Sequence, residues 1–119
     1  MLHGAGGSIE VWFRQVPDFA RYFNLLLVDL AGHGESVDDK VCHCLSFDKV
    51  ADQVMEVVIP TLYLMGENDH LFLEQAQLDV ANSCGNVSMV VVPNAGHVCN
   101  IDNKSFFNRV SIDFFSKIS

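Results

Sequence analysis

The segment from Leu25 to Ser36, LLLVDLAGHGES, constrains the fold of this 119-residue chain more than any other stretch. Its first four residues form a short apolar run bounded by turn residues, which is typical of a strand buried on both faces in a parallel sheet. Asp29 ends the run, and Gly32 and Gly34 then allow a sharp backbone turn. Because open α/β sheets build their sites where strands end at the carboxyl edge, we expect this turn to lie beside a functional site.

Short apolar runs alternate along the chain with segments whose apolar residues recur every three or four positions. Besides Leu25–Val28, the runs predict two more strands, Thr61–Met65 and Val87–Val92. The periodic segments predict four helices: Ile9–Phe23 with a break at Pro17, Phe47–Val58, Leu71–Ser83 and Lys104–Ile118. This alternation predicts an α/β fold with right-handed crossovers, in which a small, mostly parallel sheet lies between flanking helices in three layers. At 119 residues we expect a single domain over residues 1–119.

Composition excludes several classes of partner. The net charge of −8 and the absence of a basic cluster argue against nucleic acid and against an anionic membrane surface. No apolar run approaches the roughly 18 residues of a membrane span, and the first residues do not resemble a signal peptide. The cysteines show no disulfide-framework spacing, so a reducing cytoplasm is the expected location. They are Cys42, Cys44, Cys84 and Cys99.

Four segments resemble signature blocks of the α/β-hydrolase superfamily, and they occur in the order of that family. They are LHGAGGS, LLLVDLAGHGES, IPTLYLMGENDH and VVVPNAGH. The pattern is most similar to small cytosolic esterase-like members and to members that cleave C–C bonds or thioesters. The resemblance implies a reduced α/β-hydrolase-like fold and a small-molecule acyl substrate, such as an ester or a thioester, and it implies no cofactor.

The resemblance also assigns candidate site residues. Asp69 in GENDH stands where the family keeps its triad acid, and His97 in NAGH stands where it keeps the general base. Both follow predicted strands, so a carboxylate and an imidazole meet at one sheet edge, where the carboxylate holds the histidine tautomer and stabilises its cation. The backbone N–H of Ala5, directly after the turn residues His3 and Gly4, matches one donor of the oxyanion hole.

The nucleophile of the family is missing from this chain. It belongs in a Gly-x-Ser-x-Gly elbow between a strand and a helix, and no serine here stands in that motif. The elbow would fall between the predicted helix Phe47–Val58 and the strand Thr61–Met65, which only Ile59 and Pro60 separate. The chain therefore resembles an α/β-hydrolase that is truncated and internally deleted, without its first strands, its elbow or a lid.

Two hypotheses from different classes follow. In the first, the chain is a hydrolase whose nucleophile comes from a second chain or from a substitute residue. In the second, it is a non-catalytic remnant or a binding module, and the missing elbow favours this hypothesis for the isolated chain. Ser8, Ser36 and Cys99 are the substitutes that the sequence offers. We expect Ser36 to serve as a cap or turn hydroxyl, and Cys99 to pack as a small hydrophobe.

The remaining histidines have structural interpretations. We expect His33 to be a turn residue, and His43 and His70 to be solvated. The Cys42-His43-Cys44 run suits no common zinc pattern, and no further ligands are evident, so we expect no metal site.

We predict that the isolated chain self-associates or is only marginally soluble. Without the deleted strands, a sheet of Leu25–Val28, Thr61–Met65 and Val87–Val92 would leave the apolar LLLV edge unguarded by lysine or proline, and such an edge recruits a second copy. Sedimentation of the chain at a concentration on the order of tens of micromolar should show dimers or larger species. A folded, monodisperse monomer would contradict this prediction.

Overall fold

The computed structural model describes residues 1, 7–29, 34–36, 60–83 and 86–118. Contacts along the chain group into two compact units, residues 1–52 and residues 53–119. The single domain over residues 1–119 stays a prediction. The predicted helix Phe47–Val58 and the loop before it lie outside the described residues. Within the described part, no helix has the length and apolar character needed to cross a membrane.

A pair of parallel strands forms the centre of the second unit. Strand β1 runs over Thr61–Gly66 and β2 over Val87–Val92, and they pair in parallel from Thr61 opposite Val87 to Gly66 opposite Val92. Both strands are confirmed as predicted, with β1 one residue longer. A parallel pair needs a crossover between its strands, and helix α3, Leu73–Ala81, supplies it.

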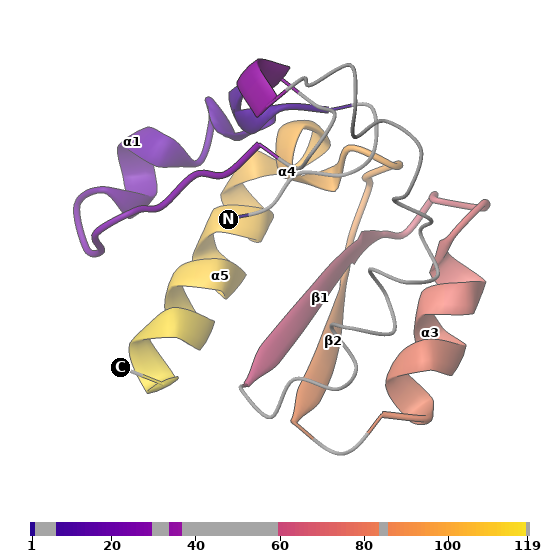
Figure 1. Cartoon of the computed structure of the whole chain (residues 1–119). Coiled ribbons are helices and arrows are strands. Elements are labelled where there is room, and N and C mark those ends of the chain that lie inside the picture. The colour runs from indigo at the N-terminus through magenta and orange to yellow at the C-terminus, as the bar shows by residue number, and fades with distance from the viewer. Residues whose placement is uncertain (2–6, 30–33, 37–59, 84–85, 119) are drawn as a thin grey trace. The chain divides into compact units, whose positions relative to one another are not determined.

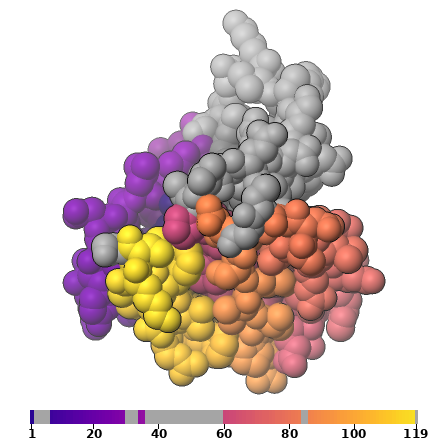
Figure 2. All heavy atoms as spheres, turned by 90° about the horizontal axis from the view of Figure 1, so that it is seen from below, coloured from indigo at the N-terminus to yellow at the C-terminus, as the bar shows by residue number. Residues whose placement is uncertain are grey.

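Helices cover both sides of this pair. Figure 1 shows α3 on one side of the strands and α4, Cys99–Asp102, with α5, Lys104–Ile118, on the other. In the space-filling view of Figure 2, the yellow atoms of α5 lie beside orange atoms, and α5 contacts α4 and β1. Val92 and Ala95 are almost fully buried in this unit, and Phe107 of α5 is buried as well. The predicted fold class, a reduced α/β arrangement with a small parallel sheet, is confirmed.

The predicted apolar faces of α3 and α5 are largely confirmed. Ala76 is buried in α3, and Leu73 and Val80 are half-buried beside it. Helix α5 has the predicted bounds, and Phe107 begins its buried stripe. Ile118, at the end of the helix, is 48 % exposed. The stripe therefore leaves the core in the last turn. Helix α4 was not predicted, because a single turn gives no measurable periodicity.

Two short helical segments stand where the first unit was predicted to contain an interrupted helix. The 3-10 helix η1 covers Ile9–Trp12, and α1 covers Val16–Phe19 with Pro17 in its first turn, where a missing N–H costs little. An interruption is present, but it falls at residues 13–15 and not at Pro17, which lies inside α1, and α1 ends at Phe19 and not at the predicted Phe23. The hydroxyl oxygen of Ser8 accepts the N–H of Glu10 at 3.3 Å and so caps η1.

The prediction that Leu25–Val28 is a strand buried on both faces of the sheet is wrong. Leu26 is 74 % exposed and Val28 is 38 % exposed, whereas Leu25 and Leu27 are half-buried, so only one face of this stretch is covered. Its backbone meets Met1: the terminal ammonium donates to the Leu26 carbonyl at 2.7 Å, and the Val28 N–H donates to the Met1 carbonyl at 3.4 Å. An apolar run indicates burial only when other layers cover both faces. Self-association through an exposed edge stays a prediction.

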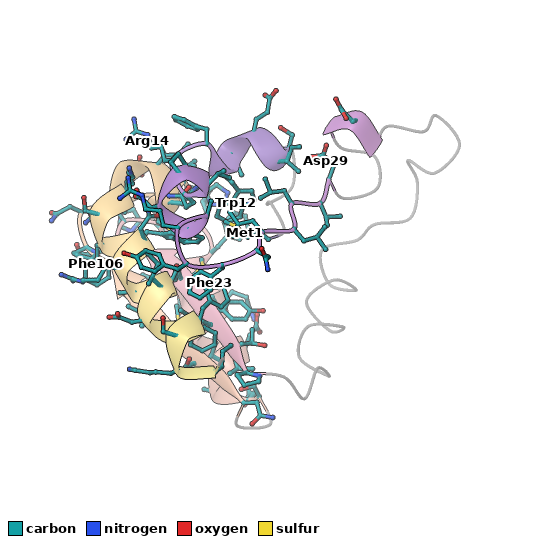
Figure 3. All side chains as sticks on the ribbon, turned by 90° about the vertical axis from the view of Figure 1, so that its left-hand side faces the viewer. Met1, Trp12, Arg14, Phe23, Asp29 and Phe106 are labelled. Carbon is teal, nitrogen blue, oxygen red and sulfur yellow. The ribbon has the colours of Figure 1, made fainter. Side chains whose placement is uncertain are left out.

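Asp29, which ends this stretch, joins separate segments of the first unit. One carboxylate oxygen accepts the N–H of Ile9 at 2.7 Å, and the other accepts the N–H of Glu35 at 2.9 Å, in the short 3-10 helix η2, Gly34–Ser36 (Figure 3). Gly34 has a φ of +52°, and a Cβ there would collide with the Asp29 carboxylate. The Asp29 carboxylate thus links η2 to η1, while residues 30–33 of the predicted turn lie outside the described residues.

We predict that Asp29→Ala destabilises the chain by about 1–3 kcal/mol, because two backbone N–H groups lose a charged acceptor. Urea unfolding measures the change in the free energy of unfolding. Asp29→Asn, which keeps one carbonyl oxygen, should lose less, and Glu35→Ala should change little because its backbone N–H remains. Equal stability of Asp29→Ala and the unmodified chain would contradict this assignment.

Candidate active site

The two loops that leave the carboxyl ends of the strands form the candidate site. Because Gly66 pairs with Val92, the strands end at the same level of the sheet. Asp69 follows β1 by three residues, and His97 follows β2 by five. Backbone bonds continue the pairing beyond the strands, since Glu67 N–H donates to Val92 O at 3.0 Å and Asn68 N–H donates to Ala95 O at 2.9 Å. The register of the sheet therefore brings the two loops together.

Asp69 and His97 are in direct contact. Nδ1 of the imidazole lies 2.9 Å from Oδ2 of the carboxylate, as expected for these two residues. The side chain of Asp69 is 3 % exposed, whereas that of His97 is 66 % exposed. A buried acid therefore meets an imidazole that remains accessible to solvent. Their roles as triad acid and base stay a prediction.

The contact determines which imidazole nitrogen carries the proton. An ionised carboxylate only accepts hydrogen bonds, so Nδ1 must donate in this pair. In the neutral ring the proton is then on Nδ1, and Nε2 keeps its lone pair. An Nε2 lone pair on an exposed ring is able to take a proton from a neighbouring hydroxyl, and the carboxylate stabilises the cation that results.

The start of α3 holds Asp69 in place. Oδ1, the oxygen that does not face His97, accepts the N–H of Phe72 at 3.3 Å, while the Asp69 carbonyl accepts the N–H of Leu73 at 3.0 Å. The N–H of Asp69 donates in turn to the Gly66 carbonyl at 3.1 Å. These bonds give the buried carboxylate partners on both oxygens, which offsets its desolvation.

An aromatic ring adjoins the imidazole. The Phe72 ring lies 5.2 Å from the His97 ring, centroid to centroid, at an interplanar angle of 38°. Phe72 is 49 % exposed. The imidazole therefore has one apolar neighbour that is itself partly open to solvent.

Side chains outside the dyad hold the turn that carries His97. Glu67 accepts the N–H of Asn94 at 3.0 Å, where the backbone has a φ of 54°, a conformation that asparagine tolerates. Asn103 donates to the Pro93 carbonyl at 2.8 Å, and Asp102 accepts the N–H of Gly96 at 2.8 Å. The sequence does not predict these three contacts, because the spacing of the residues gives no sign that their side chains bind a loop backbone.

Gly66 lets the two loops approach closely. A Cβ at this position would lie 2.0 Å from the Gly96 carbonyl oxygen, so no side chain fits there without displacing backbone. A glycine at a strand end is a known sign of close backbone approach, and this signal could have identified Gly66 from the sequence.

The structure does not describe several of the other predicted residues. Ala5, Gly4 and His3, proposed for the oxyanion hole, lie outside the described residues, as do His33 and the Cys42-His43-Cys44 run. Among the residues that the structure describes, no group of three or more potential ligands is placed to hold a metal. His70 is exposed, as expected.

Cys99 packs as the expected small hydrophobe. It is 7 % exposed, and its thiol donates to the Leu64 carbonyl at 3.4 Å. Burial raises the pKa of the thiol to about 11, so at neutral pH it remains protonated. A buried neutral thiol is a poor nucleophile, which argues against Cys99 as the substitute for the missing serine.

Comparisons with known proteins give partial similarities. Protein ABHD8 of Bos taurus is 33% identical over 57 residues, 47% of this chain and 13% of that protein. Pimeloyl-(acyl-carrier protein) methyl ester esterase of Sodalis glossinidius is 41% identical over 54 residues, 45% of this chain and 20% of that protein. (E)-2-((N-methylformamido)methylene)succinate hydrolase of Acinetobacter baylyi is 33% identical over 36 residues, 30% of this chain and 14% of that protein.

No family model matches the chain, and no solved structure matches it. The matched segments span no more than 20% of each of these three relatives. These partial matches support a distant relationship of the chain to α/β-hydrolases.

We predict that Gly66→Ala destabilises the chain by about 1–3 kcal/mol, because the added methyl group overlaps the Gly96 carbonyl. Gly96→Ala is the matched control: its Cβ would lie 3.4 Å from Asp102 Oδ2, an ordinary contact. Urea unfolding of both variants measures the difference. A Gly66→Ala chain as stable as Gly96→Ala would show that the two backbones are not in close contact.

Proposed function

We propose that this chain is an α/β-hydrolase-family protein whose site is built for an ester, a thioester or a related acyl compound. Asp69 is the acid and His97 the general base of that site. The observation that carries the proposal is the 2.9 Å contact between a buried carboxylate and an exposed imidazole at the carboxyl edge of a parallel sheet. The partial similarity to an esterase and to another hydrolase supports the same chemistry.

The proposed reaction needs one further group. In a serine hydrolase the histidine takes the hydroxyl proton of the nucleophile as it attacks the acyl carbon, and then gives that proton to the leaving group. His97 has the tautomer for the first step, because Nδ1 donates to Asp69 and Nε2 is left as the acceptor. The backbone N–H of Ala5 is the proposed oxyanion donor, and neither a cofactor nor a metal is part of the proposal.

The isolated chain is proposed to be inactive, because it contains no Gly-x-Ser-x-Gly serine. A nucleophile from a different chain that carries the elbow, or from a substitute residue, would complete the site. The proposed location is the cytoplasm, where free thiols persist.

A second candidate function is a non-catalytic one, in which the chain is a remnant or a binding module. The missing elbow favours it, since fold and dyad alone do not give catalysis. The two candidates differ in what surrounds the gene: an adjacent reading frame that encodes the elbow would favour the hydrolase.

We predict that p-nitrophenyl esters are hydrolysed no faster with the isolated chain than in buffer alone. We also predict that a fluorophosphonate probe labels none of its serines. His97→Ala and Asp69→Ala should leave that rate unchanged, because the step that they would assist has no nucleophile. Turnover by the unmodified chain that is lost in His97→Ala would contradict the proposed inactivity. Labelling of a serine would contradict the non-catalytic candidate.

A further inference from the structure

We propose that Asp102 is a positioning residue, which holds His97 within hydrogen-bond distance of Asp69 by fixing the backbone of Gly96. This inference rests on the proposed function, because it concerns the same dyad. Asp102 closes the short helix α4, and its carboxylate reaches back across six residues to accept the Gly96 N–H at 2.8 Å. A carboxylate that accepts a backbone N–H forms one of the stronger hydrogen bonds in proteins.

Both peptide groups of Gly96 are constrained. Its N–H is bound by Asp102, and its carbonyl oxygen lies so close to Gly66 that a Cβ there would be 2.0 Å away. The carbonyl belongs to the peptide bond that leads directly into His97. One side of the turn therefore rests against the end of β1, and the carboxylate holds the other side.

His97 depends on its backbone for its position. Its side chain is 66 % exposed, so packing supplies little restraint beyond the contact with the Phe72 ring at 5.2 Å. Asp69, in contrast, is buried and bonded through both oxygens. If the backbone before His97 shifts, the imidazole moves away from a fixed acid. An error of about 1 Å at such a site has large effects on the geometry of proton transfer.

Asp102 acts closer to the imidazole than the other side chains that hold this turn. Glu67 bonds to Asn94, three residues before His97, and Asn103 bonds to Pro93, four residues before it. Asp102 bonds to the residue immediately before His97. Its removal should therefore disturb the dyad while the rest of the turn stays in place.

The test is ¹⁵N NMR of the imidazole of His97 in the full chain, because this signal reports the tautomer and needs no catalysis. In the unmodified chain we expect the Nδ1–H tautomer to dominate, and Asp69→Asn should reduce it. In Asp102→Ala we expect the ratio of paired to unpaired His97 to fall about tenfold, equivalent to ~1.4 kcal/mol. Asp102→Asn, which keeps an oxygen acceptor, should retain most of the pairing.

Asp113→Ala removes the same charge from an exposed position on α5 and should leave the imidazole signal unchanged. If Asp102→Ala does not fold, Asp102→Glu replaces it, since the longer side chain keeps the charge but displaces the carboxylate; we expect it to lower the pairing. An unchanged tautomer ratio in the folded Asp102 variant would overturn the positioning role. If the tautomer ratio of His97 is the same in Asp69→Asn as in the unmodified chain, that result would instead overturn the dyad, and with it the proposed function.

Discussion

The parallel pairing of β1, Thr61–Gly66, with β2, Val87–Val92, is the interaction on which the candidate site depends. The two strands end at the same level, so the loops after them emerge side by side and continue to exchange backbone hydrogen bonds. A slip of one residue in this register would move the Asp69 loop relative to the His97 turn by about 3.3 Å, more than the length of their hydrogen bond. The position of the dyad is therefore a consequence of the sheet register.

The two side chains of the dyad lie in different environments, one buried and one exposed. Asp69 is buried, and hydrogen bonds to its oxygens compensate its lost hydration. His97 is exposed, so its second nitrogen remains reachable, and the backbone must supply the precision that packing does not. Gly66 permits the close approach of the two loops, and Asp102 binds the residue before the imidazole. These features set the geometry of the acid and base that we propose for the site.

In the first unit a single carboxylate organises the backbone. Asp29 accepts N–H groups from Ile9 and from Glu35, so it ties η1 to η2. The Leu25–Val28 run before it contacts Met1 through its backbone and leaves Leu26 exposed.

Local patterns in the sequence were sufficient for much of the second unit: β2 and α5 have the predicted bounds, and Asp69 and His97 meet as their places after two strands indicated. Strand β1 is one residue longer than predicted, and α3 is two residues shorter at each end. Such features depend on periodicity and on residues that end strands, which are local. Tertiary structure decided the rest. Leu25–Val28 was not buried on both faces, because apolar content does not state what covers a strand. The hydrogen bond of Asp102 to Gly96 forms only where the turn folds back onto α4, so no spacing in the chain predicts it.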